Sequence, residues 1–320
     1  MLHALKFVQG SIARKDFVQA LQHFRIKDGT IKGFNGMMGL CSPIDLELDI
    51  TPKADMLIKA IQACGDETIA LHVTEKSKLS IKSGKFKALV ECIPPEQYPE
   101  ILPEGESVSL TLPILAPLKK LYPFISDDAA KPWSRGILFR GASAYATNNI
   151  VLVEAWLGAT FPFEVNIPKT AIAELIRIGE EPIEVQVTEN RIAFHFEGGR
   201  WLSSQTFSTE WPDLARVLNV DSNPMDLPEG LFEALGQLAP FTDDLERVYL
   251  LPEGKLSTSQ MELDGASVEL ESLQGLTGCY NLKYLLSLAE VAQKMDFAKY
   301  PAPCQFYGEN IRGAIIGMKL

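Results

Sequence analysis

Between Ile167 and Leu218, the pattern of apolar and polar residues predicts a helix followed by a meander of strands. Apolar residues recur at helical spacing from Pro168 to Ile178. They then alternate with polar residues in three stretches, which start at Ile183, Ile192 and Trp201. Because the apolar period shortens from about 3.6 residues to about 2, the segment is predicted to place one helix against an antiparallel sheet.

The same pattern occurs three times along the chain. A shift of 114 residues toward the N-terminus, or of 113 toward the C-terminus, carries the apolar helix positions onto apolar positions again. These positions are Ile172, Leu175 and Ile178, with Ile58, Ile61 and Cys64 before them and Leu285, Leu288 and Val291 after them. With a shift of 113, Trp211-Pro212-Asp213-Leu214 also falls on Tyr98-Pro99-Glu100-Ile101. A repeat of this length indicates three copies of one domain.

Each copy is predicted to open with a second helix and to continue in short strands. The opening helices start near Leu2, Leu115 and Gly230, and a strand at Val108 to Leu112 precedes the second but has no counterpart before the first. Turns are expected at Lys27-Asp28-Gly29 and Asn148-Asn149. The expected strands are Ala20 to Ile26, Thr30 onward, Ile44 to Ile50, Gly136 to Arg140, Ser143 to Thr147, Ile150 to Leu157, Arg247 to Leu251, Leu256 to Met261 and Ser267 to Leu270. The domains are therefore predicted at residues 1–105, 106–222 and 223–320.

Composition narrows the class of protein without deciding its function. The chain is 46% hydrophobic, and no apolar run approaches the roughly 20 residues of a membrane span. Five cysteines without a C-x-x-C pair, and the lack of a signal-peptide pattern, predict a cytoplasmic protein without disulfides or a zinc site. The net charge of −11 is divided as 0, −4 and −7 among the three predicted domains. A local basic surface can exist on such a protein, so the net charge does not exclude nucleic acid.

Motifs of the common enzyme classes are absent from the sequence. It has no Gly-rich phosphate loop, no G-x-S-x-G elbow and no H-E-x-x-H zinc motif. Its four histidines fall on different predicted elements. The pairs Asp127-Asp128 and Asp243-Asp244 could hold Mg²⁺, but adjacent acidic residues in loops more often form turns. We therefore expect no catalytic residue, no cofactor and no metal.

In the order of its segments, the chain resembles the bacterial sliding DNA clamp, the beta subunit of DNA polymerase III. The resemblance spans essentially the whole chain, and no single segment is diagnostic alone. The segments are Ala146 to Leu152, Val165 to Lys169, Phe207 to Leu218 around Trp211-Pro212-Asp213, and Ile315 to Leu320. The resemblance implies an α+β fold of three tandem clamp domains, each with two helices packed on antiparallel sheet. The missing first strand predicts a divergent member, of a kind that a phage or mobile element could encode.

The resemblance further implies a homodimer that binds DNA. In the family, three domains form a half-ring, two subunits close head to tail into a six-domain ring, and the helices line a hole for duplex DNA. Such a ring is a processivity factor in DNA replication that tethers a polymerase, since contacts to phosphates hold DNA without reading its sequence. Ring closure is expected between edge strands in Lys78 to Ile93 and in Ser257 to Leu270.

The residues expected to contact DNA are mostly basic and lie on or beside the predicted helices. They are Lys6, Arg14, Lys15, Lys119, Lys120, Lys131, Trp133, Lys169, Arg177 and Lys283. Any one of these cations could equally be a solvated charge on a helix surface. The third domain has the fewest of them, so the contact with DNA is expected to be uneven around the ring.

In the family, an apolar cleft between the second and third domains binds a short peptide of the polymerase or of the clamp loader. The matching residues here are Thr147, Leu152, Pro212, Val217, Ile316 and Met318. The sequence departs from the family at Asn148-Asn149-Ile150-Val151, where Asp-Gly-His-Arg is usual, and at Gly317, where proline is usual. The preferred peptide is therefore expected to differ.

Two other functions remain open at the level of the sequence. The chain could keep the clamp fold without forming a ring, as an adaptor or decoy that captures clamp-binding peptides. It could also be a metal-dependent nuclease that uses one of the two Asp pairs. A dimer of twice 35.4 kDa would support the ring, and DNA left unchanged by Mg²⁺ or Mn²⁺ would exclude the nuclease.

Overall fold

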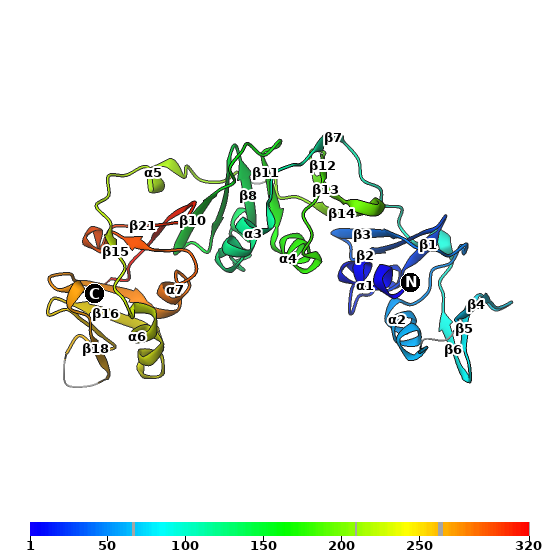
Figure 1. The fold of residues 1–320 in the computed structure, drawn as a ribbon, viewed down its shortest axis with the longest axis horizontal. Helices are drawn as coiled ribbons and strands as arrows, with labels where there is room; N and C mark the ends of the chain where they lie inside the picture. Colours follow the sequence, from blue (N-terminus) through cyan, green and yellow to red (C-terminus); the bar gives the residue numbers. More distant parts are fainter. Residues whose placement is uncertain (66–67, 209, 262–264, 320) are drawn as a thin grey trace. The chain divides into compact units, whose positions relative to one another are not determined.

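The computed structural model describes residues 1–65, 68–208, 210–261 and 265–319, which form two compact units (Figure 1). Unit 1 comprises Met1–Thr111 and Ala173–Thr206, and unit 2 comprises Leu112–Ile172 and Phe207–Leu320. Residues 209 and 320 of the segments that carry the resemblance, and residues 262–264 of the expected ring-closing strand, lie outside the described residues.

Unit 1 is built on a seven-stranded antiparallel sheet that combines the first and second sequence repeats. Its order is β1-β2-β3-β14-β13-β12-β7. The strands are β1 Arg25–Lys27, β2 Thr30–Phe34, β3 Met38–Pro43, β7 Glu106–Ser109, β12 Glu184–Val187, β13 Arg191–Phe196 and β14 Arg200–Gln205. A second sheet, in the order β4-β5-β6, contains β4 Ala70–Val73, β5 Lys78–Ser83 and β6 Phe86–Glu91.

Two helices of the first repeat pack in unit 1. Helix α1 (Leu2–Val8) lies against β2 and β3, and α2 (Ala54–Ala63) contacts both α1 and β6 (Figure 1). Leu5 and Val8 of α1 are fully buried, because residues three apart share one face of a helix. The boundary between the two units falls within α4 (Lys169–Ile178).

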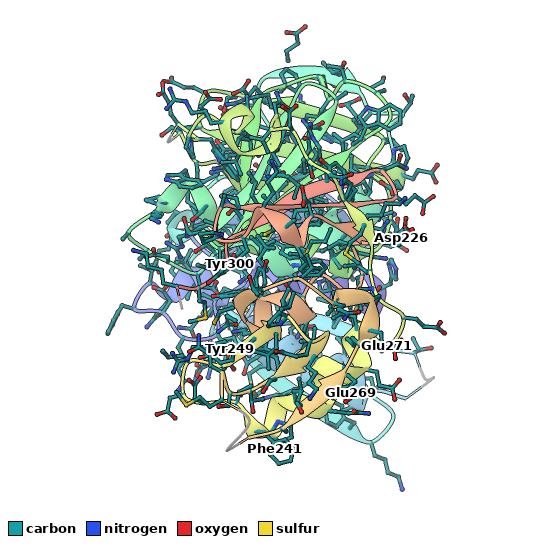
Figure 2. The ribbon with its side chains drawn as sticks, turned by 90° about the vertical axis from the view of Figure 1, so that its left-hand side faces the viewer. Asp226, Phe241, Tyr249, Glu269, Glu271 and Tyr300 are labelled. Carbon is teal, nitrogen blue, oxygen red and sulfur yellow. The ribbon has the colours of Figure 1, made fainter. Side chains whose placement is uncertain are left out.

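Unit 2 contains an eight-stranded sheet that combines the second and third repeats. Its order is β11-β8-β9-β10-β22-β21-β20-β15. The strands are β8 Gly136–Arg140, β9 Ser143–Thr147, β10 Val151–Trp156, β11 Val165–Pro168, β15 Met225–Asp226, β20 Lys294–Met295, β21 Cys304–Gly308 and β22 Ile311–Ile315. A four-stranded sheet in the order β18-β17-β16-β19 contains β16 Arg247–Leu251, β17 Lys255–Ser257, β18 Ser267–Glu269 and β19 Gly278–Asn281. Glu269 and Glu271 lie at the edge formed by β18 (Figure 2).

The helices of unit 2 cover these sheets. Helix α3 (Leu115–Leu121) packs on β9 and β10, whereas α6 (Leu231–Leu238) contacts β17, β18 and α7 (Leu282–Leu286). The one-turn helix α5 (Ala215–Leu218) contacts β22. Short 3-10 helices across the two units are Gln9–Ser11, Gln19–Gln22, Pro95–Gln97, Tyr122–Phe124, Pro132–Arg135, Glu197–Gly199, Ala239–Phe241, Glu271–Leu273 and Phe297–Lys299.

The register of the strands reproduces the repeat of 113 residues found in the sequence. Cross-strand pairs in unit 1 recur in unit 2 with both members shifted by that number. Arg25–Lys32 is repeated by Leu138–Tyr145, and Phe34–Gly39 is repeated by Thr147–Leu152. The α+β fold of repeated helix-and-sheet domains is thereby confirmed.

Both predicted turns are present and use the left-handed backbone. Asp28 and Gly29 have φ angles of 49° and 68° between β1 and β2, and Asn149 has a φ of 73° between β9 and β10. Glycine and asparagine tolerate positive φ better than other residues, which explains their presence in these hairpins.

The third strand of the first repeat is misplaced in the sequence interpretation. It was expected at Ile44 to Ile50, but the strand is Met38–Pro43, and residues 44–50 contribute only an isolated bridge between Ile26 and Ile50. Residues 44–50, in which apolar and polar residues alternate, lie along the outer edge of β1. They cannot pair with the other edge of β3, because β14 pairs there. The strand expected at Ala20 to Ile26 is likewise a 3-10 helix followed by β1.

Three further elements are shorter or shifted. The helix expected through Val291 ends at Leu286, because the following backbone bonds span three residues and form tight turns, as from Leu288 to Leu285. The strand expected at Leu256 to Met261 is limited to Lys255–Ser257. The strand expected at Val108 to Leu112 is β7, which ends at Ser109.

Candidate nucleic-acid interface and partner cleft

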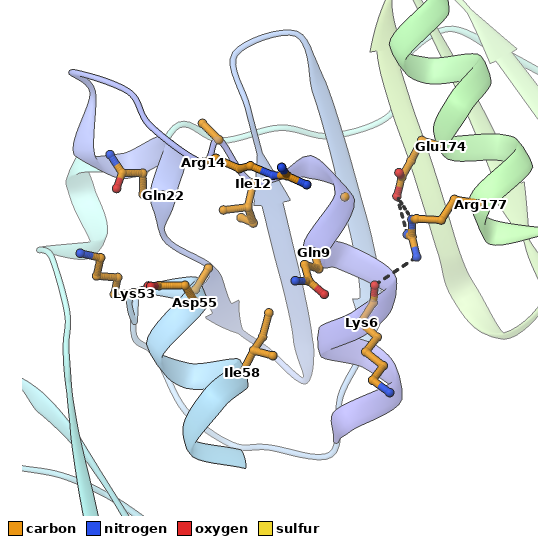
Figure 3. Close-up of a pocket in the computed structure, with 13 residues that line it drawn as sticks. Lys6, Gln9, Ile12, Arg14, Gln22, Lys53, Asp55, Ile58, Glu174 and Arg177 are labelled. Carbon is orange, nitrogen blue, oxygen red and sulfur yellow. Dashed lines mark hydrogen bonds and ion pairs between the residues drawn. The ribbon is translucent and has the colours of Figure 1, made fainter. Parts of the chain in front are cut away.

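In unit 1, basic candidates surround a depression beside α1 and α2 (Figure 3). A cavity of about 590 Å³ is bordered by Lys6 of α1, Arg14 of the next loop and Arg177 of α4. Lys53, which precedes α2, lines the same cavity and was not among the sequence candidates. The cavity therefore collects cations from segments that are distant in the sequence, although Glu174 also borders it.

Arg177 is engaged in contacts within unit 1. Its guanidinium donates hydrogen bonds to the Glu174 carboxylate (2.7 Å from Nε) and to the carbonyl oxygens of Phe7 (2.7 Å) and Lys6 (3.3 Å). A cation at the C-terminal end of α1 is favourable, because the helix dipole is negative there. Glu174 is buried against Gly10, where an added Cβ would collide with the carboxylate. Arg177 thus joins α4 to α1, so its charge is already engaged within unit 1.

The loop after α1 presents the other candidates of unit 1 to solvent. Arg14 and Lys15 are exposed and pair with no carboxylate within the part of the chain that the structure describes. Phe17 in the same loop is 105% exposed, so its ring contributes nothing to the core. An aromatic residue beside two cations suits contact with nucleic acid, and the sequence interpretation did not single it out.

In unit 2, the candidates lie on α3, on α4 and in the loop before β8. Lys119 and Lys120 occupy the last turn of α3, with Lys119 exposed. Lys169 at the start of α4 already has two partners. Its Nζ forms an ion pair with the Asp127 carboxylate at 2.7 Å and lies 5.8 Å from the Tyr122 ring centroid. Lys131 is exposed just before the 3-10 helix that leads to β8.

The third repeat contributes few cations. Lys283 is exposed on α7, but α6 has Glu233 in its first turn and no basic residue. The helices of the third repeat are therefore less basic than those of the first and second.

The two Asp pairs weighed as metal ligands have other partners. Asp127 pairs with Lys169, and the Asp243 carboxylate pairs with Arg247 at 2.5 Å. Over residues 1–65, 68–208, 210–261 and 265–319, no group of three or more His, Cys, Asp or Glu side chains could hold a metal ion.

Four of the six cleft candidates come together in unit 2. Thr147 pairs with Leu152 across β9 and β10, and the main-chain N–H of Ile316 donates to the carbonyl of Ile150 (2.9 Å). Leu152 belongs to an apolar cluster with Leu138, Trp211, Leu214 and Leu218, against which Val217 packs. Pro212 is exposed next to Trp211. Met318 is positioned through its main chain, which bonds to Cys279 (2.7 Å).

Trp133, in the 3-10 helix before β8, packs against this apolar cluster. Its ring meets that of Trp211 edge-on, with centroids 5.2 Å apart and an interplanar angle of 62°. Its main-chain carbonyl accepts a hydrogen bond from the Asn166 amide (2.8 Å), which fixes the loop. The sequence interpretation placed Trp133 near DNA, because nothing local indicates a partner that lies 78 residues away.

A buried carboxylate lies beside the cluster and joins β9, β10 and β22. Glu154 accepts hydrogen bonds from Ser143 (2.7 Å), Tyr145 (2.9 Å) and Arg312. Burial alone would raise the pKa of Glu154, but these three donors lower it below the ordinary value. Arg312 also donates to Asn219 (3.1 Å), the residue after α5. The network ties the segment that carries Trp211 to the sheet.

No protein-family model matches this sequence, and no curated protein matches it. Among solved structures, the DNA polymerase sliding clamp of Bacillus subtilis matches with a TM-score of 0.86 at 15% identity, over 100% of this chain and 97% of that chain. The DNA polymerase III beta subunit of Pseudomonas aeruginosa matches with a TM-score of 0.83 at 20% identity, with the same coverage. The chain has the sliding-clamp fold.

A third match is a clamp that was solved with a bound peptide. The Helicobacter pylori beta clamp, solved with a bound DNA ligase peptide, has a TM-score of 0.83 at 18% identity, over 100% of this chain and 97% of that chain. Among the described helices of the present chain, none combines the length and apolar character that crossing a lipid bilayer requires.

Proposed function

We propose that this protein is a sliding clamp, a homodimeric ring that encircles duplex DNA and tethers a replicative DNA polymerase without catalysing a reaction. The observation that carries the proposal is the likeness of its fold, over the whole chain, to DNA polymerase clamps. Three domains at residues 1–105, 106–222 and 223–320 belong to the same proposal, which the repeated strand register supports.

DNA would be held by cations on and beside the helices. Lysine and arginine side chains attract phosphates whatever the base sequence, and the contact must stay weak for the ring to slide. The cations that pair with no carboxylate within the described ranges are the best suited. They are Lys6, Arg14, Lys15, Lys119, Lys120, Lys131 and Lys283. Lys169 and Arg177 would contribute less because their charges are already paired.

Ring closure would join β6 of one subunit to β18 of its partner. Within the described ranges, no strand pairs with the outer edge of β6 from Phe86 to Val90, whereas the carbonyl of Glu91 accepts a hydrogen bond from the main-chain N–H of Lys53. Lys82 lies directly opposite Lys87 across β5 and β6. Like charges in that position repel each other, so an acidic partner would relieve them.

The β18 edge of the four-stranded sheet offers the complementary charge. Glu269 and Glu271 are exposed at this edge (Figure 2). Exposed apolar side chains occur near both edges, with Leu89 51% exposed on β6 and Phe241 59% exposed after α6. Edge strands with free backbone groups pair readily with another chain.

Charge reversal at the two edges tests this ring. Lys82→Glu with Lys87→Glu, or Glu269→Lys with Glu271→Lys, makes both interfaces of a homodimer repulsive. We expect each double variant to sediment as a monomer, with the dimer dissociation constant raised at least about a hundredfold. Mixing the two variants restores attraction at both interfaces of a heterodimer, so the dimer should return.

Retention on DNA separates a ring from a protein that only binds peptides. The wild-type dimer, once loaded on nicked circular DNA, should stay bound and should leave when the circle is cut. The charge-reversed monomers are the matched control and should be retained on neither form. Wild-type protein that is monomeric at micromolar concentration, or equally retained on linear and circular DNA, would contradict the proposal.

The cleft of unit 2 would bind a short peptide of the polymerase or of the clamp loader. The peptide-bound clamp of Helicobacter pylori supports this assignment. Asn148, Asn149 and Ile150 bring no charge to the cleft, and the partly buried Trp133 adds aromatic surface. We therefore expect it to prefer apolar and aromatic anchors over acidic residues.

A further inference from the structure

A second cavity lies in unit 1, on the face of the seven-stranded sheet that points away from α1. Its volume is about 600 Å³, and its lining includes Arg25, Lys32, Cys41, Tyr98, Ile101 and Trp201. Gly33, the neighbour of Lys32 on β2, faces the carbonyl oxygen of Val8 in α1. Because successive residues of a strand point to opposite faces, Lys32 lies on the other side of the sheet.

The internal repeat places a filled version of this surface in unit 2. At an offset of 113, Arg25, Lys32 and Cys41 correspond to Leu138, Tyr145 and Glu154, while Tyr98 and Ile101 correspond to Trp211 and Leu214. In unit 2, helix α5 follows Leu214, and its Leu218 joins the apolar cluster that contains Leu138. Leu218 is only 4% exposed. A single helical turn therefore covers in unit 2 the surface that stays open in unit 1.

Among its described residues, unit 1 has no segment that fills the cavity. After Ile101, residues 102–105 lead directly into β7, and they contain Pro103. Gly105 has a φ of 104°, and an added Cβ would collide with the carbonyl of Val187. Only four residues separate Ile101 from β7, and the positive φ of Gly105 is not helical, so no helical turn forms here. Unit 1 therefore has the surface that α5 covers in unit 2, but its described residues include no counterpart of α5.

The chemistry of the cavity differs from that of its counterpart at one position in particular. Lys32 takes the place of Tyr145, and its ammonium group pairs with no carboxylate within the residues that the structure describes. Arg25, by contrast, is satisfied by Asp49 at 2.6 Å. Lys32 lies near the thiol of Cys41, where it partly opposes the burial that raises the pKa of Cys41 to about 11. An unpaired cation thus borders a cavity of mixed lining, in which Ile101 and Trp201 supply apolar surface.

A second unsatisfied group borders the same cavity. The Tyr98 hydroxyl is buried and has no hydrogen-bond partner within the described residues. Burial raises the pKa of this phenol, so it remains a neutral donor. A buried donor without an acceptor is unfavourable. The hydroxyl itself is shielded from solvent, so a ligand in the cavity would contact the Tyr98 ring.

We propose that this cavity docks a helical turn of a partner protein that carries a leucine-like side chain followed by one acidic residue. The apolar side chain occupies the space between Tyr98, Ile101 and Trp201, as Leu218 covers the counterpart surface in unit 2. The carboxylate pairs with Lys32. In unit 2 the residue after Leu218 is Asn219, which lies over the Arg312–Glu154 pair.

Charge at the rim limits the partner further. Glu96 and Glu100 are exposed on the segment that crosses the sheet, so they would repel a second acidic residue. The site is separate from the cleft of unit 2, and docking there requires neither ring closure nor DNA.

The test uses a peptide derived from α5. The probe is a capped peptide of residues 214–220 that carries N219D, titrated into the full-length protein while the Ile101 methyl and Trp201 indole signals are followed by NMR. We expect saturable shifts at both signals. The Lys32→Glu variant should bind this probe about fivefold more weakly, the size of a half-exposed ion pair. The same variant should prefer a probe that carries N219K.

Two controls isolate the proposed contacts. Lys59→Glu makes the same change of charge on α2 and should leave probe affinity unchanged, while a probe with Leu218→Asp should fail to bind the wild type. Absence of shifts at Ile101 and Trp201, or binding that Lys32→Glu leaves unaltered, would overturn the proposal. Neither result affects the sedimentation and DNA-retention tests of the ring, so the two proposals fail independently.

Discussion

The two large sheets join sequence repeats through the same backbone ladder, but different side chains meet at the junction. In unit 1, β3 pairs with β14 and Cys41 lies opposite Trp201. In unit 2, β10 pairs with β22 and Glu154 lies opposite Arg312. At this pair the junction of unit 1 is apolar and that of unit 2 is ionic, although the other pairs between β10 and β22 are apolar. The main-chain ladder therefore defines the fold, while the side chains decide which conditions weaken each unit.

The largest effect is expected from the apolar junction. Trp201 is 8% exposed and packs with Cys41 and Ile101, so Trp201→Ala should lower the free energy of unfolding by about 3–5 kcal/mol. Urea unfolding, with hydrogen exchange to locate the loss in unit 1, measures it. Trp156→Ala is the matched control, because Trp156 ends β10 at 54% exposure and should cost little. Equal losses in the two variants would show that the junction does not depend on Trp201.

A smaller effect is expected from the ionic junction. Arg312→Met leaves the Glu154 carboxylate without its cation, although Arg312 is 42% exposed and water can partly replace it. We expect a loss of about 1–2 kcal/mol. Adding Glu154→Gln should recover part of it, because the remaining buried group is then neutral. A double-mutant cycle measures the coupling, and strictly additive single effects would mean that the pair contributes nothing as a pair.

The smallest contrast is in the response to pH. All four histidines lie in unit 1, and burial lowers the pKa of His23 and His195 below 6.5. A group with a depressed folded-state pKa favours the unfolded chain as pH falls below its unfolded value, so unit 1 should lose stability first. In unit 2, the depressed pKa of Glu154 contributes to stability above about pH 4.5. That stability is lost only as pH falls from about 4.5 through the lower pKa of Glu154 in the folded protein.

Hydrogen exchange at about pH 7 and about pH 5.5, corrected for intrinsic rates, separates these responses. Protection in β13 should fall modestly between the two conditions, while protection in β10 and β22 should hold. His195→Gln should reduce the change in β13. A parallel loss of protection in both units would contradict the assignment to histidine.

The repeat made much of the fold predictable from the sequence. The 113-residue offset aligned the β1–β2 hairpin with the β8–β9 hairpin, and their strand registers are the same. The bounds of β8 and β9 also match those expected from the sequence. What the offset could not show is which strands meet between repeats. Because β3 pairs with β14, residues 44–50 lie outside the sheet ladder. This holds even though apolar and polar residues alternate more regularly in 44–50 than in β3.

The sequence predicted which basic residues border the candidate nucleic-acid interface better than it predicted their contacts. Charge and helical position identified Arg177, but its acceptors at Lys6 and Phe7 lie 171 and 170 residues away, so its engagement could not be foreseen. Lys53 was missed although it directly precedes α2, because only folding brings it to the cavity that Lys6 and Arg14 border. Trp211-Pro212 marked the segment that carries the proposed cleft, whereas the contact of Trp133 with Trp211 could not be read from the sequence.

Pairing between repeats also delays folding during translation, because each sheet needs a strand that is synthesised much later. The last residue of β3 is Pro43, but β14 begins at Arg200, and β10 likewise ends at Trp156 before β22 begins at Ile311. At a translation rate of about 5–20 residues per second, each leading edge waits roughly ten to thirty seconds for its partner strand. During that interval a nascent chain displays an unpaired edge that other chains can join. Polysomes carrying this message would therefore be the place where its aggregation begins.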